Sequence, residues 1–510
     1  MMRGGAGHVY GAVVIIMFAT IFCFAIIAAA GEKVAKKRVA IVGGGIGGAS
    51  AAYYLTHPVD GTGVDDNVEI IAFETRDYIG GRLKHTVLDG QVVELGGDAW
   101  STAANLYVRD LAKRVGGGVK TARGVKDAAS GLVESIFVAR SNQQKKRRLD
   151  PITSGVGVWN GTSVLDLQKD VVGPHLLADA ILGVKELAFL GRLRLNYAER
   201  GKSHTFDRIE DFLSKGGIDT YISEKSSDFM NRAHVSATVQ ANFLEPLQRV
   251  IYDQTLNDTH SFATLVSLTS MVGADSFDGG NSLLVEKLFA AANATIALGT
   301  SVKKISRSSI GNGTFEVESI SKNGARKDIV DSVVLAAPFR FLNISLPQEA
   351  VSPEMRKREF THWYVTVVKA AGLSEEYFKD ARVANFTNML TTQSSSAPFN
   401  VIQQVTDPIE KGQGSYWKLF SNSEIAGELL ARIFVDADVN GSIVQHWPYT
   451  FPHLTPTQSA GDPDKTNFQP LNLMPGMVYV NAMESLASAM ETSIIGARNA
   501  AQILRSTTLL

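Results

Sequence analysis

A chain of 510 residues is too long for one compact core, and at roughly 150 residues per domain it predicts two or three domains. Hydrophobic residues make up 45% and charged residues 20%, which excludes the disordered and fibrous classes. Lys and Arg total 50 against 51 Asp and Glu, so the net charge of −1 argues against a nucleic-acid partner. The one basic run, 145–148, is interpreted as a solvated loop.

The first segment has the pattern of a secretory signal. Arg3 precedes an uncharged apolar run over 12–30 that ends in three alanines, so we expect a signal peptide over residues 1–30. An uncleaved anchor is the alternative, because a run of 19 residues can just span a bilayer. The single cysteine, Cys23, lies in this run, which excludes disulfides, cysteine zinc sites and a thiol nucleophile from the rest of the chain.

Seven Asn-X-Ser/Thr sequons fit a chain that enters the secretory pathway. They begin at Asn160, Asn257, Asn293, Asn312, Asn343, Asn385 and Asn440. No later stretch reaches 18 apolar residues. We therefore expect a glycosylated lumenal protein of the lysosome or vacuole, with secretion as the other address.

A dinucleotide-binding loop follows the signal. A β-branched run predicts a buried strand over 38–42, and small residues predict a closely packed helix over 49–55. Between them, the first glycine of a G-x-G-x-x-G pattern permits a tight turn, the second lets the backbone approach a pyrophosphate, and the third lets helix pack on strand. The helix N-terminus faces the phosphate charge. The predicted cofactor contacts of this loop are Gly43, Gly45, Ile46, Gly47 and Gly48.

The second predicted strand, over 68–73, ends at Glu74 and completes a βαβ unit with a parallel pair of strands. A carboxylate at this position accepts hydrogen bonds from ribose hydroxyls. The same charge repels a 2′-phosphate, so NADP is not expected.

Two short segments distinguish a flavin site from a nicotinamide site. The sequence Tyr-Ile-Gly-Gly-Arg lies at 78–82, and Glu-Leu-Gly-Gly-Asp lies at 94–98. Both resemble segments that follow the dinucleotide loop in flavin-containing amine oxidases, where the glycines approach the cofactor and the arginine lies near its phosphates or flavin edge. The resemblance implies that the cofactor is FAD. It also implies contacts from Gly81, Arg82, Gly97, Asp98 and, further along the chain, Val302.

The remaining pattern alternates between helical and strand-rich regions. Residues 120–275 are predicted to be mostly helical, with an untidy insert over 141–153. Alternating runs predict strands over 295–302, 315–320 and 329–337. A strand-rich region then extends to about residue 460 and leaves through a proline-rich stretch.

The end of the chain returns to the cofactor. A strand over 477–480 and a helix over 488–504 stand where flavin amine oxidases and their relatives complete the FAD site. A helix N-terminus at that place can hold partial negative charge on the reduced flavin. The predicted contacts here are Glu484, Met490 and Glu491.

We therefore expect an α/β protein with a Rossmann-type FAD-binding domain, similar to amine oxidases and glutathione reductase, and an interleaved α+β substrate-binding domain. The FAD-binding domain is expected to comprise residues 36–118, 279–345 and 470–510. The substrate domain is expected to comprise a mostly helical part, 119–278, and a strand-rich part, 346–465.

The tail over 487–493, Ala-Ser-Ala-Met-Glu-Thr-Ser, resembles the prenylcysteine oxidase (prenylcysteine lyase) family. Further stretches that resemble this family are 245–254, 262–281, 416–421 and the proline-rich element 448–456. Two features depart from it: the sequence Asp98-Ala99-Trp100 after the second glycine pair, where relatives have smaller or histidine-containing sequence, and the insert over 141–153.

This resemblance implies oxidative cleavage of the thioether of free prenylcysteine by an FAD-dependent oxidoreductase. Oxygen and water are consumed, and cysteine, a prenyl aldehyde and hydrogen peroxide are formed during the breakdown of prenylated proteins. The cofactor carries the difficult step, so no metal is expected and no catalytic side chain is assigned. The lipid substrate is compatible with peripheral membrane contact, and neither nucleic acid nor an obligate protein partner is expected.

The prenyl chain requires an apolar slot, since each buried CH₂ contributes about 0.8 kcal/mol. The lining is predicted from the helical region: Phe212, Phe229, Phe243 and Phe262. Two other functions stay open. One is an FAD-dependent polyamine or amine oxidase, which needs an acidic or aromatic cage for its cationic substrate. The other is a lumenal flavoprotein that carries lipid without turnover.

Overall fold

The computed structural model of the chain describes residues 36–58, 63–102, 104–121, 155–172, 189, 193, 205–214, 216–270, 274–311, 313–351, 358–406, 414–457 and 468–509. The predicted signal peptide over 1–30, the basic run and the insert over 141–153 lie outside these residues. Within the described ranges, no helix is both long and apolar enough to cross a membrane.

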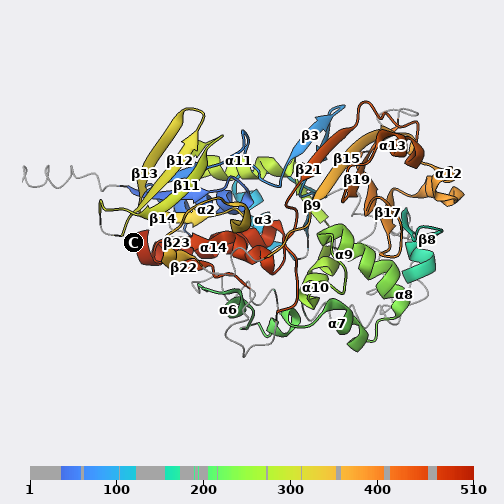
Figure 1. The fold of residues 1–510 in the computed structure, drawn as a ribbon, viewed down its shortest axis with the longest axis horizontal. Coiled ribbons are helices and arrows are strands. Elements are labelled where there is room, and N and C mark those ends of the chain that lie inside the picture. Colours follow the sequence, from blue (N-terminus) through green and yellow to red (C-terminus); the bar gives the residue numbers. More distant parts are fainter. Residues whose placement is uncertain are drawn as a thin grey trace, which may run out of the picture.

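A six-stranded sheet forms the first half of the molecule (Figure 1). In order across the sheet the strands are β10 (Thr295–Ala297), β2 (Val68–Phe73), β1 (Lys37–Val42), β14 (Ser332–Leu335), β23 (Met477–Tyr479) and β22 (Asn472–Met474). All neighbours are parallel except the edge strand β22, which runs antiparallel to β23. Strands of this kind are buried on both faces, which explains their nearly continuous apolar sequences.

Helices cover one face of this sheet and a smaller sheet covers the other. The helices α2 (Ile46–Thr56), α11 (Asn281–Ala291) and α14 (Met490–Leu504) share one apolar cluster with alternate residues of β1. The opposite face packs against β11 (Ser301–Arg307), β12 (Phe315–Ser321) and β13 (Gly324–Val330). The predicted Rossmann-type α/β fold is confirmed.

Two predicted strands are each divided between two sheets. The run over 295–302 gives β10 in the large sheet and the start of β11 in the small one, because a turn intervenes in which Gly299 has a φ of 58°. The run over 329–337 divides in the same way at Asp331, between β13 and β14. A period of two residues identifies a strand but does not show where the chain leaves a sheet.

A seven-stranded sheet forms the second half. In order across the sheet its strands are β21 (Ile443–Trp447), β15 (Trp363–Ala370), β19 (Ser415–Ser421), β18 (Val401–Gln404), β17 (Asn388–Thr391), β7 (Val156–Trp159) and β8 (Val164–Asp166). Only β7 and β17 pair in parallel. The sheet lies above the helices α7 to α10 in the view of Figure 1.

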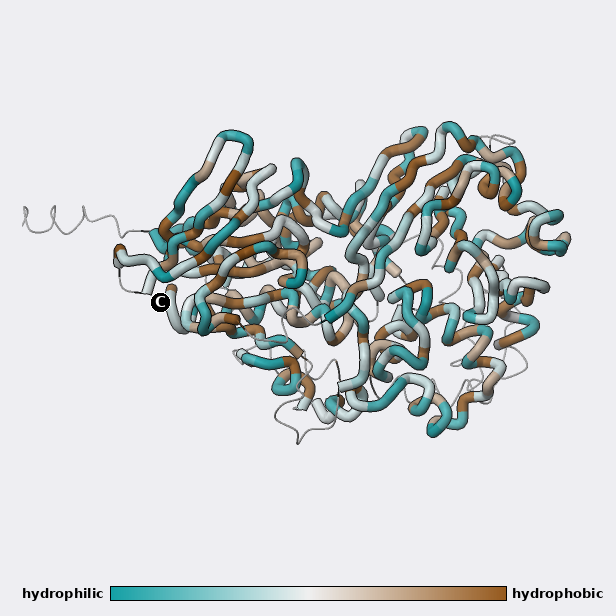
Figure 2. Tube along the Cα trace, in the orientation of Figure 1, coloured by the Kyte–Doolittle hydropathy of each residue, from teal (hydrophilic) through white to brown (hydrophobic). Residues whose placement is uncertain are grey.

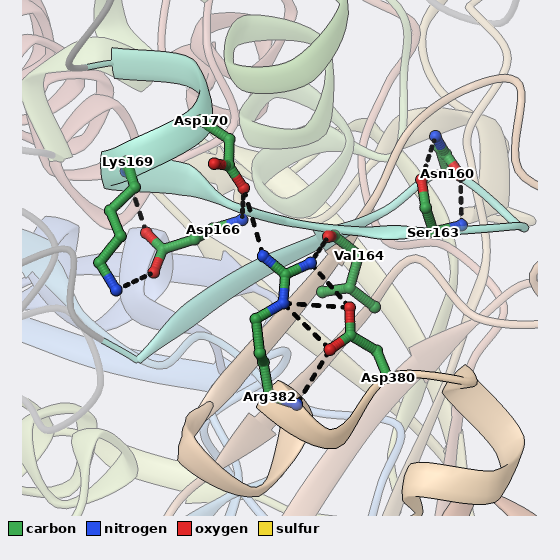
Figure 3. Close-up of polar contacts among 8 residues, drawn as sticks. All are labelled: Asn160, Ser163, Val164, Asp166, Lys169, Asp170, Asp380 and Arg382. Atoms are coloured by element: carbon green, nitrogen blue, oxygen red, sulfur yellow. Dashed lines mark hydrogen bonds and ion pairs between the residues drawn. The ribbon is translucent and has the colours of Figure 1, made fainter.

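The expectation of a mostly helical segment over 119–278 missed β7 and β8, which extend the seven-stranded sheet at one edge. Each strand is short, and β7 finds its partner β17 far along the chain, so the local pattern contained little sign of the pairing. Figure 3 shows how this hairpin is attached: the Arg382 guanidinium donates to the carbonyl of Val164 at 2.5 Å and pairs with Asp380 and Asp170.

The other elements connect and cover the two large sheets. The helices of the second half are α7 (Ser226–Arg232), α8 (Ala237–Val239), α9 (Glu245–Tyr252), α10 (Ser261–Thr269), α12 (Glu375–Phe378) and α13 (Gly427–Ile433), whereas α6 (Ile209–Ser214) lies below α14 in Figure 1. The remaining elements are the hairpin β3 (His85–Leu88) with β4 (Gln91–Glu94), the pair β16 (Gly372–Leu373) and β20 (Phe434–Val435), the small sheet of β5 (Trp100–Ser101), β9 (Ala274–Phe277) and β6 (Val119–Thr121), and helix α3 (Leu106–Arg114). The strands β6 and β9 also lie within the segment over 119–278 that was expected to be mostly helical. Hydrophobic residues follow the strands and helices inside both halves, whereas the outer turns are hydrophilic (Figure 2).

Candidate FAD site and the adjoining sheet

The three glycines of the G-x-G-x-x-G loop are required for different reasons. A Cβ at Gly43, whose φ is 122°, would lie 2.4 Å from the carbonyl oxygen of Ala336. A Cβ at Gly48 would lie 2.1 Å from the carbonyl oxygen of Gly43. Packing within the protein therefore fixes these two glycines. A Cβ at Gly45 would lie 3.8 Å from the nearest protein atoms, so packing does not require glycine at this position. A ligand that approaches the backbone closely does require it.

Two helix N-termini meet beside Gly45. Gly45 is the N-cap residue of α2 and Ala489 is that of α14, and neither has a side chain that can cap a helix. A Cβ added at Gly47 would lie 3.1 Å from Val480 Cγ1 and 3.9 Å from Ser493 Cβ, so the first turns of the two helices are adjacent. Free N–H groups and two positive dipole ends make this a place for an anionic ligand such as a pyrophosphate. Ile46 is the first residue of α2.

Glu74 lies at the end of β2, as the sequence predicts. Its Oε2 accepts a hydrogen bond of 2.8 Å from the Gly44 N–H, and its Oε1 accepts one of 2.9 Å from the Arg76 N–H. The Thr300 N–H donates to the Glu74 carbonyl at 2.8 Å, which brings the start of β11 next to this carboxylate. Val302 follows two residues later and is buried. Glu74 and Val302 therefore lie at the same end of the cofactor sheet.

The two glycine pairs lie against the loop. The Gly80 N–H donates to the Gly44 carbonyl at 2.8 Å, and a Cβ at Gly81 would lie 3.2 Å from Gly45 Cα. The Gly97 N–H in turn donates to the Arg82 carbonyl at 2.9 Å. The structure thus brings Gly81, Arg82 and Gly97 into one layer beside Gly45.

Arg82 connects this layer to the C-terminal part of the site. Its guanidinium forms an ion pair with Glu484 and donates to the carbonyl of Thr450 at 2.7 Å. Asn481 Nδ2 donates to the same Glu484 oxygen at 2.6 Å. Glu484 Oε2 and Asn481 Oδ1 are both buried and accept no hydrogen bond from the described residues. Two buried acceptors without donors are costly, and the ribityl hydroxyls of FAD are donors of the kind that they lack.

The carboxylate of Glu491 serves the protein rather than the cofactor. It accepts hydrogen bonds of 2.9 Å from the backbone N–H groups of Leu106, Tyr107 and Val108, and so caps α3. The side chain of Glu491 is thus used by α3, and the predicted contact of this residue with FAD stays a prediction. Met490 is also buried, in the apolar cluster shared by α2 and α14. Met490 and Glu491 form the start of α14, so their backbone N–H groups, rather than their side chains, are available to a cofactor.

Sequence reasoning missed a buried charge pair beside the second glycine pair. Lys418 of β19 is completely buried, and its Nζ donates to Asp98 Oδ2 at 3.0 Å and to the Glu94 carbonyl at 3.2 Å. Burial raises the pKa of Glu94 to about 8. The signal in the sequence is a single lysine among the apolar and aromatic residues 416–420.

The stretch over 245–254 has a structural role. Arg249 donates to the carbonyl of Thr392 at 2.7 Å and to Asn400 Oδ1 at 2.6 Å. Asp253 accepts from Asn400 at 2.6 Å and from Asn422 at 2.7 Å. The polar side chains of α9 therefore attach this helix to the seven-stranded sheet.

The four phenylalanines predicted to line a prenyl slot are all buried in one core cluster. Phe262 packs edge-on against Phe189 with ring centroids 5.2 Å apart, and Phe212 packs against Phe206 at 5.2 Å. These contacts are those of core packing, so the lining by Phe212, Phe229, Phe243 and Phe262 stays a prediction. No group of three or more His, Cys, Asp or Glu in the described residues could hold a metal ion.

The glycine loop, the two uncapped helix N-termini, Glu74 and the unsatisfied acceptors at Glu484 and Asn481 fit FAD, which is the cofactor of this protein. The fold and the site together define a flavoprotein of the oxidoreductase class. The second, seven-stranded sheet supplies the surface on which such enzymes differ.

Comparisons with known proteins identify the family. A family model described as prenylcysteine lyase matches residues 189–508, and the chain belongs to this family. A second model, described as an NAD(P)-binding Rossmann-like domain, matches residues 41–115. The family resemblance predicted from the sequence is therefore confirmed.

Two curated relatives and one solved structure illustrate the similarity. Prenylcysteine oxidase 1 of Homo sapiens is 27% identical over 502 residues, which cover 91% of this chain and 88% of the relative. Farnesylcysteine lyase of Arabidopsis thaliana is 25% identical and covers 93% of this chain and 89% of its own. The structure of cyclohexylamine oxidase from Brevibacterium oxydans aligns with a TM-score of 0.58 at 13% identity, covering 91% of this chain and 98% of its own, and shares the fold.

Proposed function

We propose that the protein oxidatively cleaves the thioether of free prenylcysteine. The observation that carries this proposal is the extent of the family match, which includes the helices α7 to α10 and most of the seven-stranded sheet as well as the C-terminal FAD segment. The likeness to an amine oxidase is one of fold alone, at 13% identity.

The overall reaction consumes one prenylcysteine, one oxygen and one water, and yields cysteine, a prenyl aldehyde and hydrogen peroxide. A hydride leaves the prenyl carbon next to sulfur, water adds to that carbon, and the C–S bond breaks when the resulting hemithioacetal collapses. When bound, FAD would supply the hydride acceptor and the means of passing both electrons to oxygen. Atoms and electrons balance without a metal or a further reductant.

The chain's own residues position the reactants. Arg82, Glu484 and Asn481, which are joined to one another by an ion pair and a hydrogen bond, would hold the cofactor from the side of the C-terminal segment. An aromatic cluster on the adjoining sheet, formed by Trp363, Phe420, Trp447 and Phe451, provides an apolar surface beside the cofactor layer. Trp447 touches that layer directly, since its Nε1–H donates to the Leu95 carbonyl at 2.6 Å. Such a surface suits a prenyl chain, and excluding water there favours the cation that develops beside sulfur.

We also propose that the protein acts in the lumen of the secretory pathway, in the lysosome or vacuole or after secretion. Five of the seven sequon asparagines are exposed: Asn257, Asn293, Asn343, Asn385 and Asn440. Asn160 is half-buried and Asn312 lies outside the described residues. Exposure is what attachment of a glycan requires.

The test is anaerobic mixing of the purified flavoprotein with S-farnesylcysteine, and separately with spermidine, while the visible flavin absorbance is followed. The proposal expects bleaching with farnesylcysteine and, after oxygen is admitted, one hydrogen peroxide and one farnesal per cysteine released. Bleaching by spermidine alone would show an amine oxidase instead. A flavin that neither compound reduces would show a protein without this turnover.

A further inference from the structure

The buried ammonium group of Lys418 is unusual in this chain. Among the described residues it is the one lysine without exposed surface, and burying an ammonium is costly unless it is paired. Its partners are Asp98 Oδ2 and the Glu94 carbonyl, and its Nζ lies 5.2 Å from the centroid of the Phe420 ring. The pair joins the seven-stranded sheet to the segment that follows the second glycine pair.

Lys418 is not needed to hold the backbone of that segment. Asn281 Nδ2 donates to the carbonyls of Gly97 and Asp98, each at 2.9 Å. The Asn281 N–H donates to Glu94 Oε1 at 2.6 Å. Because these bonds already fix the main chain, what Lys418 determines is the direction of the Asp98 side chain.

Asp98 retains an acceptor. Only Oδ2 is bonded to Lys418, no described residue donates to Oδ1, and 39% of the side chain is exposed in the protein without cofactor. The neighbouring Glu94 carboxyl is neutral below about pH 8, because burial raises its pKa to about 8. Asp98 is therefore the anionic group at this place that can receive a cation from outside the protein.

The surroundings of Asp98 suit a molecule with a charged head and an apolar tail. The strand register places Lys418 and Phe420 of β19 on the same face of the sheet as Val365 and Val367 of β15. Trp363 and Trp447 continue this face at the next pair in the register. Asp98 is thus linked through Lys418 to the strand that carries Phe420 of the aromatic cluster, and it directly follows Gly97, which bonds to Arg82 of the cofactor layer.

We propose that Asp98, positioned by Lys418, binds the α-ammonium group of the substrate's amino-acid head. This assigns Asp98 to the substrate rather than to FAD, and it rests on the proposed function. Lys418 is a positioning residue: it holds one carboxylate oxygen so that the other points toward the bound amine. The prenyl chain then extends along the aromatic cluster.

The experiment compares three substrates that share the farnesyl thioether. S-Farnesylcysteine and its methyl ester carry the ammonium, whereas N-acetyl-S-farnesylcysteine does not. Steady-state kinetics are measured for the wild type, Asp98→Asn, Lys418→Met and Lys418→Arg, and FAD affinity is measured for each protein by the recovery of flavin fluorescence on dilution. The matched control is Asp89→Asn, because Asp89 is also partly exposed and pairs with a lysine of the neighbouring strand, Lys369, at 2.9 Å.

The expected result is a rise of about tenfold or more in KM for the two ammonium substrates in Asp98→Asn, with KM for the N-acetyl compound changed less than twofold. Lys418→Met should raise the same two KM values. Lys418→Arg should bring them part of the way back to the wild-type values, and Asp89→Asn should leave all three KM values unchanged. FAD affinity should stay within about twofold throughout.

Two results would overturn the inference. An equal rise in KM for all three substrates would show a general effect on the site, and loss of FAD from Asp98→Asn would return this residue to the cofactor. Failure of the proposed function is recognised separately, because then the wild type oxidises none of the three compounds.

Discussion

The six-stranded sheet and the seven-stranded sheet differ in what fixes their geometry. In the first, backbones approach so closely that side chains must be absent, as at Gly43 and Gly48. In the second, charged side chains cross between elements: the partly buried Arg249 does so from α9 and the fully buried Lys418 from β19. The cofactor half is thus specified by backbone contacts, and the substrate half by polar side chains that must be satisfied where water is excluded.

This difference has a functional consequence. A cofactor common to many enzymes can be held by main-chain groups that tolerate few changes, whereas a substrate surface is altered by exchanging side chains. Substitutions should therefore disturb the two halves in different ways.

The largest expected effect separates two glycines of the same loop. Gly48→Ala places a Cβ 2.1 Å from the Gly43 carbonyl oxygen, so we expect loss of the folded protein. Gly45→Val meets no protein atom at that distance, and its Cβ would lie 3.8 Å from the nearest. We expect this variant to fold and to lose FAD, because the side chain occupies the position of the pyrophosphate.

Circular dichroism reports folding and visible absorbance reports FAD, with wild-type apoprotein as the reference. A yellow, fully loaded Gly45→Val would contradict the placement of the cofactor. A Gly48→Ala variant that folds like the wild type would contradict the packing argument.

The second prediction concerns two arginines of the substrate half. Arg249→Met leaves the Thr392 carbonyl and Asn400 without their donor in the interior, and should lower the free energy of unfolding by about 3 kcal/mol or more. Arg382→Met removes the ion pairs with Asp380 and Asp170 and the hydrogen bond to the Val164 carbonyl, but because this arginine side chain is 52% exposed the loss should be smaller, about 1 kcal/mol (Figure 3). Urea denaturation measures the free energy of unfolding of both variants. Equal decreases would contradict the contrast between a charge with buried partners and an exposed one.

The third prediction tests whether Glu491 caps a helix or binds FAD. Glu491→Gln weakens the three hydrogen bonds at the start of α3, because an amide offers one acceptor atom in place of two. We expect a loss of about 2 kcal/mol in the free energy of unfolding, with FAD affinity unchanged. The control is Asp110→Asn on the exposed side of the same helix, which should cost less than about 0.5 kcal/mol. A large loss of FAD from Glu491→Gln would restore the cofactor role of its side chain.

The smallest expected effect is a pH dependence. Burial raises the folded-state pKa of Glu94 to about 8 from its ordinary value of 4.5, so between these two pH values the native state holds a proton that the unfolded state releases. Stability from this group is complete below pH 4.5 and is lost as the pH rises toward 8. His260, whose pKa burial lowers from 6.5 to about 3, acts in the opposite direction and only below about pH 6.5.

Between pH 6.5 and 8 the wild type should therefore lose about 1 kcal/mol of stability per pH unit, and Glu94→Gln should show a flatter profile. Unfolding at a series of pH values checks this. Parallel profiles for the two proteins would mean that Glu94 is ionised in the folded state.

Much of the cofactor half could be predicted because its signals are local. The predicted strand over 68–73 agrees with β2, and the predicted helix over 488–504 contains α14. A glycine loop between a strand and a helix has one well-known structural context, so Gly43, Gly45 and Gly48 could be placed from spacing alone.

The rest depends on contacts between distant residues. Nothing near Glu491 in the sequence shows that its carboxylate meets the first turn of α3. The N-cap residue of that helix, Asn105, uses its side-chain oxygen to accept a hydrogen bond from the Ser101 N–H instead. Nothing near Lys418 indicates Asp98 as its partner. Such pairs are created by the tertiary fold, and a periodic pattern records only which residues are buried, not what they meet.

The packing of α14 on α2 also bears on how the protein is made. A ribosome releases the glycine loop at the start of synthesis, but the helix that packs on α2 and completes the FAD site is near the other end of the chain. The apolar face of α2 therefore stays uncovered during synthesis until residues 490–504 have emerged. Termination just before residue 490 keeps all six strands of the cofactor sheet but removes the helix that packs on α2, so even this short truncation should abolish the enzyme.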